Sequence, residues 1–184
     1  MKPLLRGEGL GLVRGGRILF EGLDLKLDPG EGLHLSGPNG SGKTSLIRLV
    51  AGLLPPNAGR IERTDAALAD DKLALDRELP LGRALKFWNG PRLAEAVEAF
   101  ALSGLMEVPV RLLSTGQARR AQLARAMASG APLWLLDEPL NGLDRRGIEE
   151  LDRAIDRHRS GGGAIVAASH SPLGGDWVRL ELGS

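Results

Sequence analysis

The 184-residue sequence lacks two residue types altogether. It contains no cysteine and no tyrosine, and only three phenylalanines and three tryptophans. Without cysteine the chain forms neither disulfides nor thiolate metal sites, which suits a reducing compartment. Its longest apolar runs include Leu133–Leu136 and Ala164–Ala168, far short of the ~18–20 residues that span a bilayer. Arg6 and Glu8 interrupt the start of the chain before the apolar core of a signal peptide forms. We therefore expect a cytoplasmic location.

An excess of charge of one sign is also missing. Lys and Arg total 24 and Asp and Glu total 23, so the formal net charge is +1. The two signs are mixed along the chain, without a basic stripe for nucleic acid or a polybasic cluster for a lipid surface. We expect no nucleic-acid partner. The length suits one domain, 1–184, with a sizeable core.

Glycine, in contrast, is abundant, and a glycine-rich motif dominates the sequence. The stretch Gly37-Pro-Asn-Gly-Ser-Gly-Lys-Thr44 matches G-x-x-x-x-G-K-[ST], the phosphate-binding loop. A strand candidate, Gly32–Ser36, precedes it and a predicted helix, Ser45–Leu54, follows, as this motif requires. Loop N–H groups bind phosphate oxygens, Lys43 adds a mobile charge, and the Thr44 hydroxyl is placed for Mg²⁺. A chance glycine-rich turn does not account for both flanks, so the sequence predicts a nucleoside triphosphate site.

Elsewhere the pattern predicts strands that alternate with helices. Two apolar-rich runs at the start indicate an antiparallel β layer, because the second alternates apolar and charged residues. The expected elements are strands at Leu4–Val13 and Ile18–Leu27, a weak strand region at Arg60–Asp71, helices at Arg83–Trp88, Arg92–Ala101, Gln117–Ser129 and Asp144–Arg159, and buried strands at Leu133–Leu136 and Ala164–Ala168. Such alternation implies an α/β fold with a parallel core.

Two acids, Asp137 and Glu138, end one of the buried strands. Ligands of open α/β sheets lie at the carboxyl ends of strands, where these acids fall. Asp137 is suited to hold the Mg²⁺ shell, and Glu138 to polarise a water aligned on the γ-phosphate. The alternative is a pair of solvated acids that cap the next turn. The phosphate-binding loop in the same chain favours the first interpretation.

The segment Leu113-Ser-Thr-Gly-Gln117 resembles the signature of the ATPase subunits of ABC transporters, with Thr115 in place of the first glycine of Leu-Ser-Gly-Gly-Gln. Ser114 and Gln117 also spell a capping box for the helix that they begin. The two interpretations are compatible, since a capped helix N-terminus is itself an anion site. In family order, Asn141-Gly-Leu-Asp144 then matches the D-loop, and His170 matches the switch histidine. His34 and His158 match no motif and receive no role.

The resemblance covers nearly the whole chain and implies a phosphate-loop NTPase core of the ABC ATPase type, with an antiparallel β layer and a small helical subdomain at approximately residues 72–130. It implies ATP and Mg²⁺ as cofactors, a homodimer with ATP, and integral membrane transporter subunits that hold the chain on the cytoplasmic face of the inner membrane. The residues carried over are Gly37, Pro38, Asn39, Gly40, Ser41, Gly42, Lys43, Thr44 and Ser45 for the nucleotide, Ser114, Thr115, Gly116 and Gln117 for the signature in trans, Asp144 for the D-loop, Thr44 and Asp137 for the metal, and Glu138 and His170 for catalysis.

Within the family the chain is most similar to the haem-exporter ATP-binding subunits of cytochrome c maturation. The residues that carry this finer resemblance are Leu19-Phe20, Leu113–Arg120 and Gly130–Pro139, besides the phosphate loop. No direct haem site is recognised, because the sequence holds no Cys-x-x-Cys-His.

The chain departs from the family pattern at the Q-loop glutamine, which is expected within Asp70–Ala74. The only glutamines of the sequence are Gln117 and Gln122. Either the charges of this segment are solvated and a water completes the metal shell, which we favour, or Lys72 or Asp71 takes the place of the amide.

A second departure concerns the adenine base, for which the family supplies a stacking aromatic. None lies near Val13–Arg17. Arg14 or Arg17 has a guanidinium plane suited to stacking. Phe20 is the other candidate, although its strand context favours a place in the core.

Three alternative functions stay open. The first is the ATPase subunit of another ABC exporter or importer, the second is a DNA-repair or chromosome-structuring ATPase, and the third is a nucleotide-binding regulatory module without efficient hydrolysis. The second class carries a long coiled-coil insertion, whereas only Ser45–Leu112 separates the loop from the signature here. The missing glutamine favours the third, and the intact Lys43, Glu138 and His170 oppose it.

Overall fold

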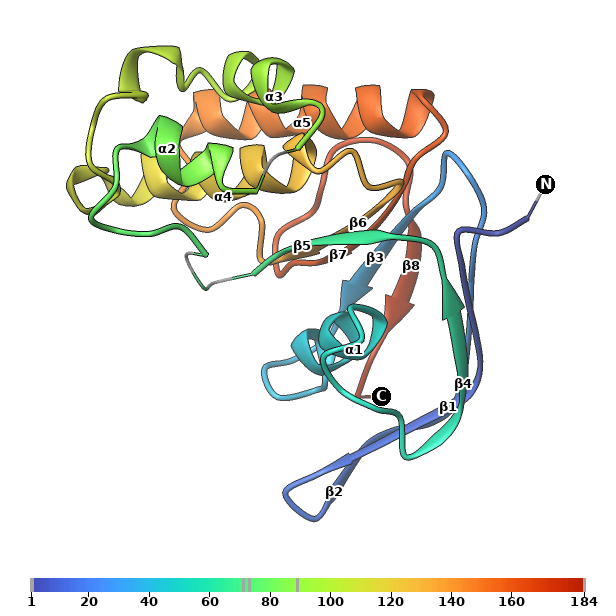
Figure 1. Ribbon diagram of the computed structural model, residues 1–184. Helices are drawn as coiled ribbons and strands as arrows, with labels where there is room; N and C mark the ends of the chain where they lie inside the picture. Colours follow the sequence, from blue (N-terminus) through green and yellow to red (C-terminus); the bar gives the residue numbers. More distant parts are fainter. Residues whose placement is uncertain (1, 71, 73, 89, 184) are drawn as a thin grey trace.

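The computed structural model describes residues 2–70, 72, 74–88 and 90–183. Figure 1 shows two sheets with helices on either side of the larger one. The strands are β1 (Leu5–Arg14), β2 (Arg17–Leu27), β3 (Gly32–Ser36), β4 (Ala58–Arg63), β5 (Ala66–Ala69), β6 (Leu133–Asp137), β7 (Ala164–Ala168) and β8 (Val178–Glu181). The helices are α1 (Lys43–Val50), α2 (Leu81–Lys86), α3 (Leu93–Ala99), α4 (Thr115–Ala128) and α5 (Arg145–Ser160), with 3₁₀ turns η1 (Ser103–Leu105) and η2 (Val110–Leu112).

The smaller sheet confirms the predicted antiparallel layer. Its strand order is β2-β1-β4, and both pairings of β1 are antiparallel. At the tip of the β1–β2 hairpin, Val13 pairs with Ile18 and Arg14 with Arg17. The side chain of Asn57 accepts a hydrogen bond from the Val13 N–H at 2.7 Å, which fixes the hairpin near its tip.

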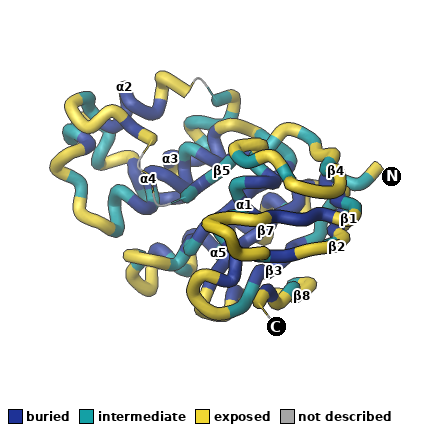
Figure 2. The backbone as a smooth tube through the Cα atoms, turned by 90° about the horizontal axis from the view of Figure 1, so that it is seen from below, coloured by how far each residue is buried: buried dark blue, intermediate teal, exposed yellow. Residues whose placement is uncertain are grey.

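The larger sheet is parallel, with strand order β5-β6-β7-β3-β8. Every residue of β6 and β7 is buried, because both faces of a parallel sheet are covered. Alternate residues serve the two faces: Trp134 and Leu136 face α3, α4 and α5, whereas Leu133 and Leu135 face α1 and the antiparallel sheet. Figure 2 shows the buried residues concentrated in the strands between these layers.

One predicted element was wrong. The region Arg60–Asp71 is two strands, β4 and β5, which belong to different sheets. At Thr64-Asp65 the chain leaves the antiparallel sheet and enters the parallel one. The short β5 buries Ala67 and Ala69, small residues that give little periodic signal.

Two further differences concern ends and edges. The first helix ends at Val50 rather than at Leu54, because Gly52, with φ of 78°, closes it in a Schellman motif. In that motif the Leu53 N–H donates to the Arg48 carbonyl at 2.8 Å. Strand β8 was not predicted, and three of its four residues are exposed. The other elements agree within two residues at either end.

The helices α2 and α3 lie with α4 at one end of the molecule (Figure 1). A subdomain spanning approximately residues 72–130 stays a prediction. Within the described part of the chain, no helix has both the length and the apolar character to cross a membrane.

Candidate functional site

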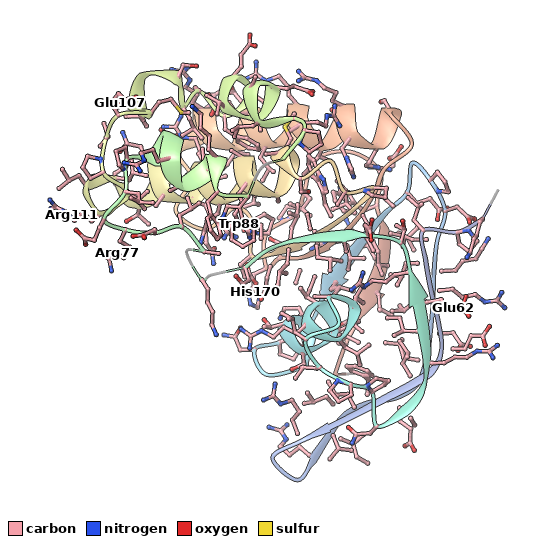
Figure 3. All side chains as sticks on the ribbon, in the orientation of Figure 1. Glu62, Arg77, Trp88, Glu107, Arg111 and His170 are labelled. Atoms are coloured by element: carbon pink, nitrogen blue, oxygen red, sulfur yellow. The ribbon has the colours of Figure 1, made fainter. Side chains whose placement is uncertain are left out.

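The motifs come together at the carboxyl edge of the parallel sheet. The phosphate loop follows β3, Asp137 ends β6, and His170 lies two residues after β7. Because neighbouring parallel strands end at the same edge, segments distant in sequence share one site. His170 lies between α1 and the helices on the other side of the sheet in Figure 3.

The conformation of the phosphate loop explains its glycines. Gly37, Gly40 and Gly42 have φ values of 131°, 80° and 106°, a region that side chains with a Cβ rarely adopt. A Cβ on Gly37 would also collide with the carbonyl oxygen of Leu182, beyond β8. The loop therefore depends on glycine both for its turn and for its contact with the last strand.

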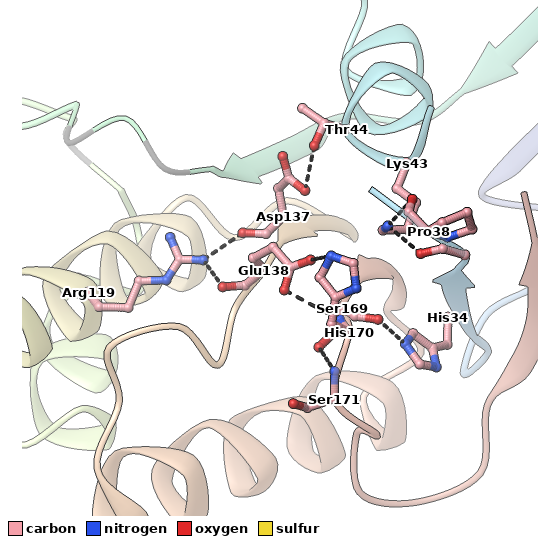
Figure 4. A network of polar contacts seen from close by, with 11 residues as sticks. His34, Pro38, Lys43, Thr44, Arg119, Asp137, Glu138, Ser169, His170 and Ser171 are labelled. Atoms are coloured by element: carbon pink, nitrogen blue, oxygen red, sulfur yellow. Dashed lines mark hydrogen bonds and ion pairs between the residues drawn. The ribbon is translucent and has the colours of Figure 1, made fainter. Parts of the chain in front are cut away.

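Lys43 begins α1 and folds back over the loop. Its Nζ donates to the carbonyl of Gly37 at 2.7 Å and to that of Pro38 at 3.1 Å, as Figure 4 shows. The side chain is buried at 7% exposure. The ammonium group is thus held over the loop by two backbone carbonyls.

A cavity of about 610 Å³ adjoins the loop. Its lining is made by Arg14, Leu19, Asn39, Gly40, Gly42, Lys43, Thr44, Ser45, Glu138, Asn141 and His170. The phosphate loop, the acid directly after β6 and the histidine after β7 therefore share one cavity. Of the candidates for the base, Arg14 lines it, whereas Phe20 is buried in the core at 8% exposure.

Two side-chain oxygen atoms of the kind that bind metal ions meet in this site. The Thr44 hydroxyl donates to Asp137 Oδ1 at 3.1 Å (Figure 4), and Asp137 is buried at 7% exposure. Mg²⁺ takes oxygen ligands and usually has only one or two from the protein, with phosphates and water as the rest. This donor pair fits the predicted metal.

Glu138 has an unusual backbone and an accessible side chain. Its φ is 47°, and left-handed backbone costs a residue with a Cβ roughly 1–2 kcal/mol. Glu138 Oε1 lies 3.3 Å from His170 Nε2, and the His170 N–H donates to Oε2 at 3.4 Å. The carboxylate therefore lies against the histidine at the edge of the cavity.

The signature begins α4 as a capping box, which confirms that interpretation of Ser114 and Gln117. The Gln117 N–H donates to Ser114 Oγ at 3.3 Å, and the Ser114 N–H donates to Gln117 Oε1 at 2.9 Å. Thr115 lines a second cavity, of about 410 Å³, which extends from Arg77 to Asp137 and Glu138. Residues 113–117 are not among those that line the cavity beside the phosphate loop.

The D-loop packs against the signature. A Cβ on Gly142 would lie 3.1 Å from the methyl group of Thr115, and one on Gly116 would lie 2.9 Å from the Gly142 carbonyl oxygen. Asp144 caps α5, since its Oδ1 accepts from the Gly147 N–H at 2.7 Å. The predicted D-loop residue Asp144 therefore has a structural role in its own chain, as the N-cap of α5.

The two histidines without a predicted role are buried elsewhere. His34 Nε2 lies 3.0 Å from the Ser169 carbonyl oxygen. His158 stacks on Trp134 at 3.9 Å between ring centroids. Burial lowers the pKa of His158 to about 4, against weaker opposing hydrogen bonds.

The segment expected to hold the Q-loop glutamine is partly described. Lys72 is exposed, and its backbone N–H donates to Asp70 Oδ1 at 3.2 Å. Asp71 lies outside the described residues. Which residue, if any, replaces the glutamine stays a prediction.

This fold and this edge of the sheet define a phosphate-loop ATPase of the ABC type. The sequence profile described as ABC transporter matches residues 20–141, and the chain belongs to the ABC transporter family. Two curated relatives are cytochrome c biogenesis ATP-binding export proteins CcmA. That of Novosphingobium aromaticivorans is 58% identical, over 90% of this chain and 88% of its own length, and that of Sphingopyxis alaskensis is 51% identical, over 94% and 93%. Within the family the chain belongs with these proteins.

Solved structures agree with the fold. An inward-facing metal-chelate type ABC transporter is 26% identical, with a TM-score of 0.81, over 94% of this chain and 75% of that one. An ABC transporter ATP-binding protein from Pyrococcus furiosus has a TM-score of 0.84 at 21% identity, over 97% and 96%, and shows likeness of fold alone. The predicted ABC ATPase fold is confirmed.

Proposed function

We propose that the chain binds ATP with Mg²⁺ in the cavity beside the phosphate loop and hydrolyses it to drive an exporter of cytochrome c biogenesis. The observation that carries this proposal is the shared carboxyl edge, where the loop, the Thr44–Asp137 pair and the Glu138–His170 pair meet. The two residues of each pair are distant from one another in the sequence. The names of the curated relatives support the same assignment.

The proposed chemistry follows from the placement of these groups. The loop N–H groups and Lys43 bind the β- and γ-phosphates, and Thr44 and Asp137 hold Mg²⁺, which offsets negative charge on the phosphates when it is bound. Glu138 accepts a proton from the attacking water as the water oxygen bonds to the γ-phosphorus and the bond from that phosphorus to the β,γ-bridging oxygen breaks, so that ADP and inorganic phosphate leave. His170, beside the Glu138 carboxylate, orients that carboxylate and donates a hydrogen bond toward the γ-phosphate.

We further propose that the complete site needs two copies of the chain. Ser114 and Gly116 begin α4 outside the nucleotide cavity of their own chain, whereas the signature is expected to contact ATP. A head-to-tail pair with two-fold symmetry places the signature of each copy over the phosphate loop of the other. Such an isologous arrangement closes two equivalent sites.

The transported substrate belongs to separate membrane subunits in this proposal. By resemblance to the haem exporters of cytochrome c maturation, these subunits handle haem, and this chain supplies ATP-driven work from the cytoplasmic face of the inner membrane. A strain without the gene should lose mature cytochrome c and regain it with the wild-type gene, but not with the Glu138→Gln form.

Replacing Glu138 by Gln tests the catalytic role. The amide keeps the shape of the side chain but cannot take up the proton, so turnover should fall about 10²–10⁴-fold while ATP still binds. Glu149→Gln on α5, an exposed position paired with Arg145, is the matched control. Wild-type turnover in Glu138→Gln would remove Glu138 from the role of base.

Light scattering of the Glu138→Gln protein tests the assembly. Because the bound ATP is not consumed, a dimer should accumulate with ATP and Mg²⁺ and dissociate without them. A protein that stays monomeric with ATP, even beside its membrane subunits, would contradict the two-copy site.

A further inference from the structure

A buried arginine joins the ends of two neighbouring strands behind the acids. Arg119 of α4 is 6% exposed. Its Nη2 donates to the carbonyl of Asp137 at 2.6 Å and to that of Glu138 at 2.7 Å, both at the end of β6. Its Nη1 donates to the carbonyl of Asp70, just after β5, at 2.7 Å and to Gln122 Oε1 at 3.0 Å. Figure 4 shows the guanidinium beside the carbonyls of Asp137 and Glu138.

These contacts bear on the unusual backbone of Glu138. The two carbonyls that Nη2 binds are the ones on either side of the Glu138 Cα, and they lie on one side of a residue with φ of 47°, whereas extended backbone would turn them to opposite sides. Carbonyls at a buried strand end require donors, and a charged donor gives short, strong hydrogen bonds. The guanidinium therefore fits the left-handed form of Glu138 and not an extended one.

We propose that Arg119 is a positioning residue for hydrolysis. It holds the Glu138 backbone in the left-handed conformation, which aims the carboxylate along the cavity toward His170 and the phosphate loop. The inference rests on the proposed role of Glu138 as the base. Arg119 Nε also donates to the Pro139 carbonyl at 3.4 Å. The planar, permanently charged fork of arginine suits this four-carbonyl site, which the point charge of lysine fills only in part.

The same guanidinium connects Glu138 to the segment that lacks the glutamine. Asp70 begins the stretch 70–74, where the family amide is expected. In this chain a link between that stretch and the strand-end acids comes from α4, through Arg119 Nη1 and Nη2. A shift of Asp70 thereby acts on the backbone of the proposed base.

A second arginine of α4 provides the comparison for a purely structural role. Arg125 Nη2 donates to the Leu68 carbonyl at 2.6 Å, and its guanidinium lies 4.6 Å from the ring centroid of Trp88. It thus binds β5 at Leu68, and its charge interacts with that of Asp70, but none of these contacts is with Asp137 or Glu138. Arg125→Gln removes a comparable backbone contact without touching Glu138.

The first measurement is steady-state ATPase kinetics of the full chain carrying Arg119→Gln, Arg119→Lys or Arg125→Gln. Misplacement of a catalytic group by about 1 Å costs up to ~10²-fold, so we expect kcat of Arg119→Gln to fall about 10–100-fold. KM for ATP should change less than about threefold, because substrate contacts stay. Arg119→Lys should recover part of the loss, and Arg125→Gln should keep kcat near the wild-type value.

The second measurement combines each arginine variant with Glu138→Gln. If Arg119 acts through Glu138, the double variant should turn over no more slowly than Glu138→Gln alone. Losses that multiply, an equal loss in Arg125→Gln, or unchanged kcat in Arg119→Gln would overturn the proposal. Should Arg119→Gln not fold, the same cycle with Arg119→Lys decides. Wild-type turnover in Glu138→Gln alone would instead refute the proposed base.

Discussion

Two histidines lie at opposite ends of the same pair of strands, and they show how differently the two ends of the parallel sheet are built. His170 follows the carboxyl end of β7, is half exposed, and lies 3.3 Å from a Glu138 carboxylate oxygen. His158, at the end of α5, is 8% exposed and stacks on Trp134 near the amino end of β6. A Cβ on Gly163, just before β7, would collide with its ring. One imidazole faces a cavity, and the other is enclosed by packing.

The comparison indicates that the side-chain contacts at the carboxyl end of the parallel sheet are exchangeable, whereas those at its amino end are fixed by packing. Both contacts of His170 with Glu138, one from its ring and one from its backbone N–H, are long and solvent-accessible, and we expect a phosphate to displace them. His158 is held by stacking on Trp134, with 12° between the two ring planes, and by the neighbouring backbone. We expect substitutions at the first end to affect turnover and those at the second to affect stability.

Of the substitutions that compare the two ends, removal of His170 should have the largest effect. Loss of one preorganised donor near developing charge typically costs about 10²–10³-fold in turnover, so His170→Ala should lower kcat by this amount. Its midpoint of thermal unfolding should stay within ~1–2 °C of wild type, because exposed side chains contribute little to stability. ATPase rates and thermal unfolding of the same preparation test both parts.

His158→Phe is the matched substitution at the other end. The phenyl ring keeps the stacking on Trp134, so turnover at neutral pH should be unchanged. A loss of turnover as large as that of His170→Ala would show that the two ends of the sheet are not functionally distinct.

Lowering the pH should also distinguish the two ends of the sheet, through its effect on stability. The pKa of His158 is about 4 in the folded chain, mainly because of burial, with Arg92 adding a small repulsion, against about 6.5 when unfolded. Between these values the unfolded chain binds the proton and the folded chain does not. The free energy of unfolding therefore falls as pH drops from 6.5 to 4, by at most about 3 kcal/mol.

Denaturant unfolding at pH 7, 5.5 and 4 measures this fall. His158→Phe removes the titrating group and should flatten the pH dependence. An identical pH slope in the wild-type and His158→Phe proteins would assign the acid sensitivity to other groups.

The carboxyl end was also the more predictable from the sequence. A phosphate loop, a strand ending in two acids and an ordered histidine leave local patterns, and the structure brings Lys43, Glu138 and His170 into one cavity. The stacked His158 leaves none, because its partners are fixed by packing between α5 and β6. Arg119 was missed for a related reason: its partners are mostly backbone carbonyls, which every residue has.

The division of Arg60–Asp71 was missed on different grounds. Strand β4 is largely exposed and β5 is made of Ala-Ala-Leu-Ala, so neither carries strong alternation. Only the pairing of β4 with β1 and of β5 with β6 separates them. Such pairing is a property of the tertiary fold.

A smaller effect is expected from the backbone strain at Glu138. Glycine adopts φ of 47° without the cost borne by alanine, so Glu138→Gly should be more stable than Glu138→Ala by roughly 1 kcal/mol. The same pair of substitutions at Glu149, inside α5, should show the opposite order, since glycine weakens a helix by about 1 kcal/mol relative to alanine. Chemical denaturation of the four variants measures both differences, and equal stability of the Glu138 pair would show that the left-handed conformation relaxes in the variants.

The smallest effect concerns the base of the nucleotide, at the hairpin end of the cavity. Arg14 and Leu19 line this end, and a guanidinium stacks on adenine and guanine alike. We therefore expect GTP and ATP to be hydrolysed with kcat/KM values within about tenfold, a difference below ~1.4 kcal/mol. An exposed cation–π contact contributes about 0.5–1 kcal/mol, so Arg14→Ala should raise KM for both nucleotides about two- to fivefold and leave kcat unchanged, as loss of uniform binding does.

Arg17→Ala is the matched control, because Arg17 pairs with Arg14 across the hairpin but is not among the residues that line the cavity. Equal KM changes in the two variants would mean that the hairpin contributes only general positive charge, and a rise confined to GTP would mean that Arg14 reads the base rather than stacking on it.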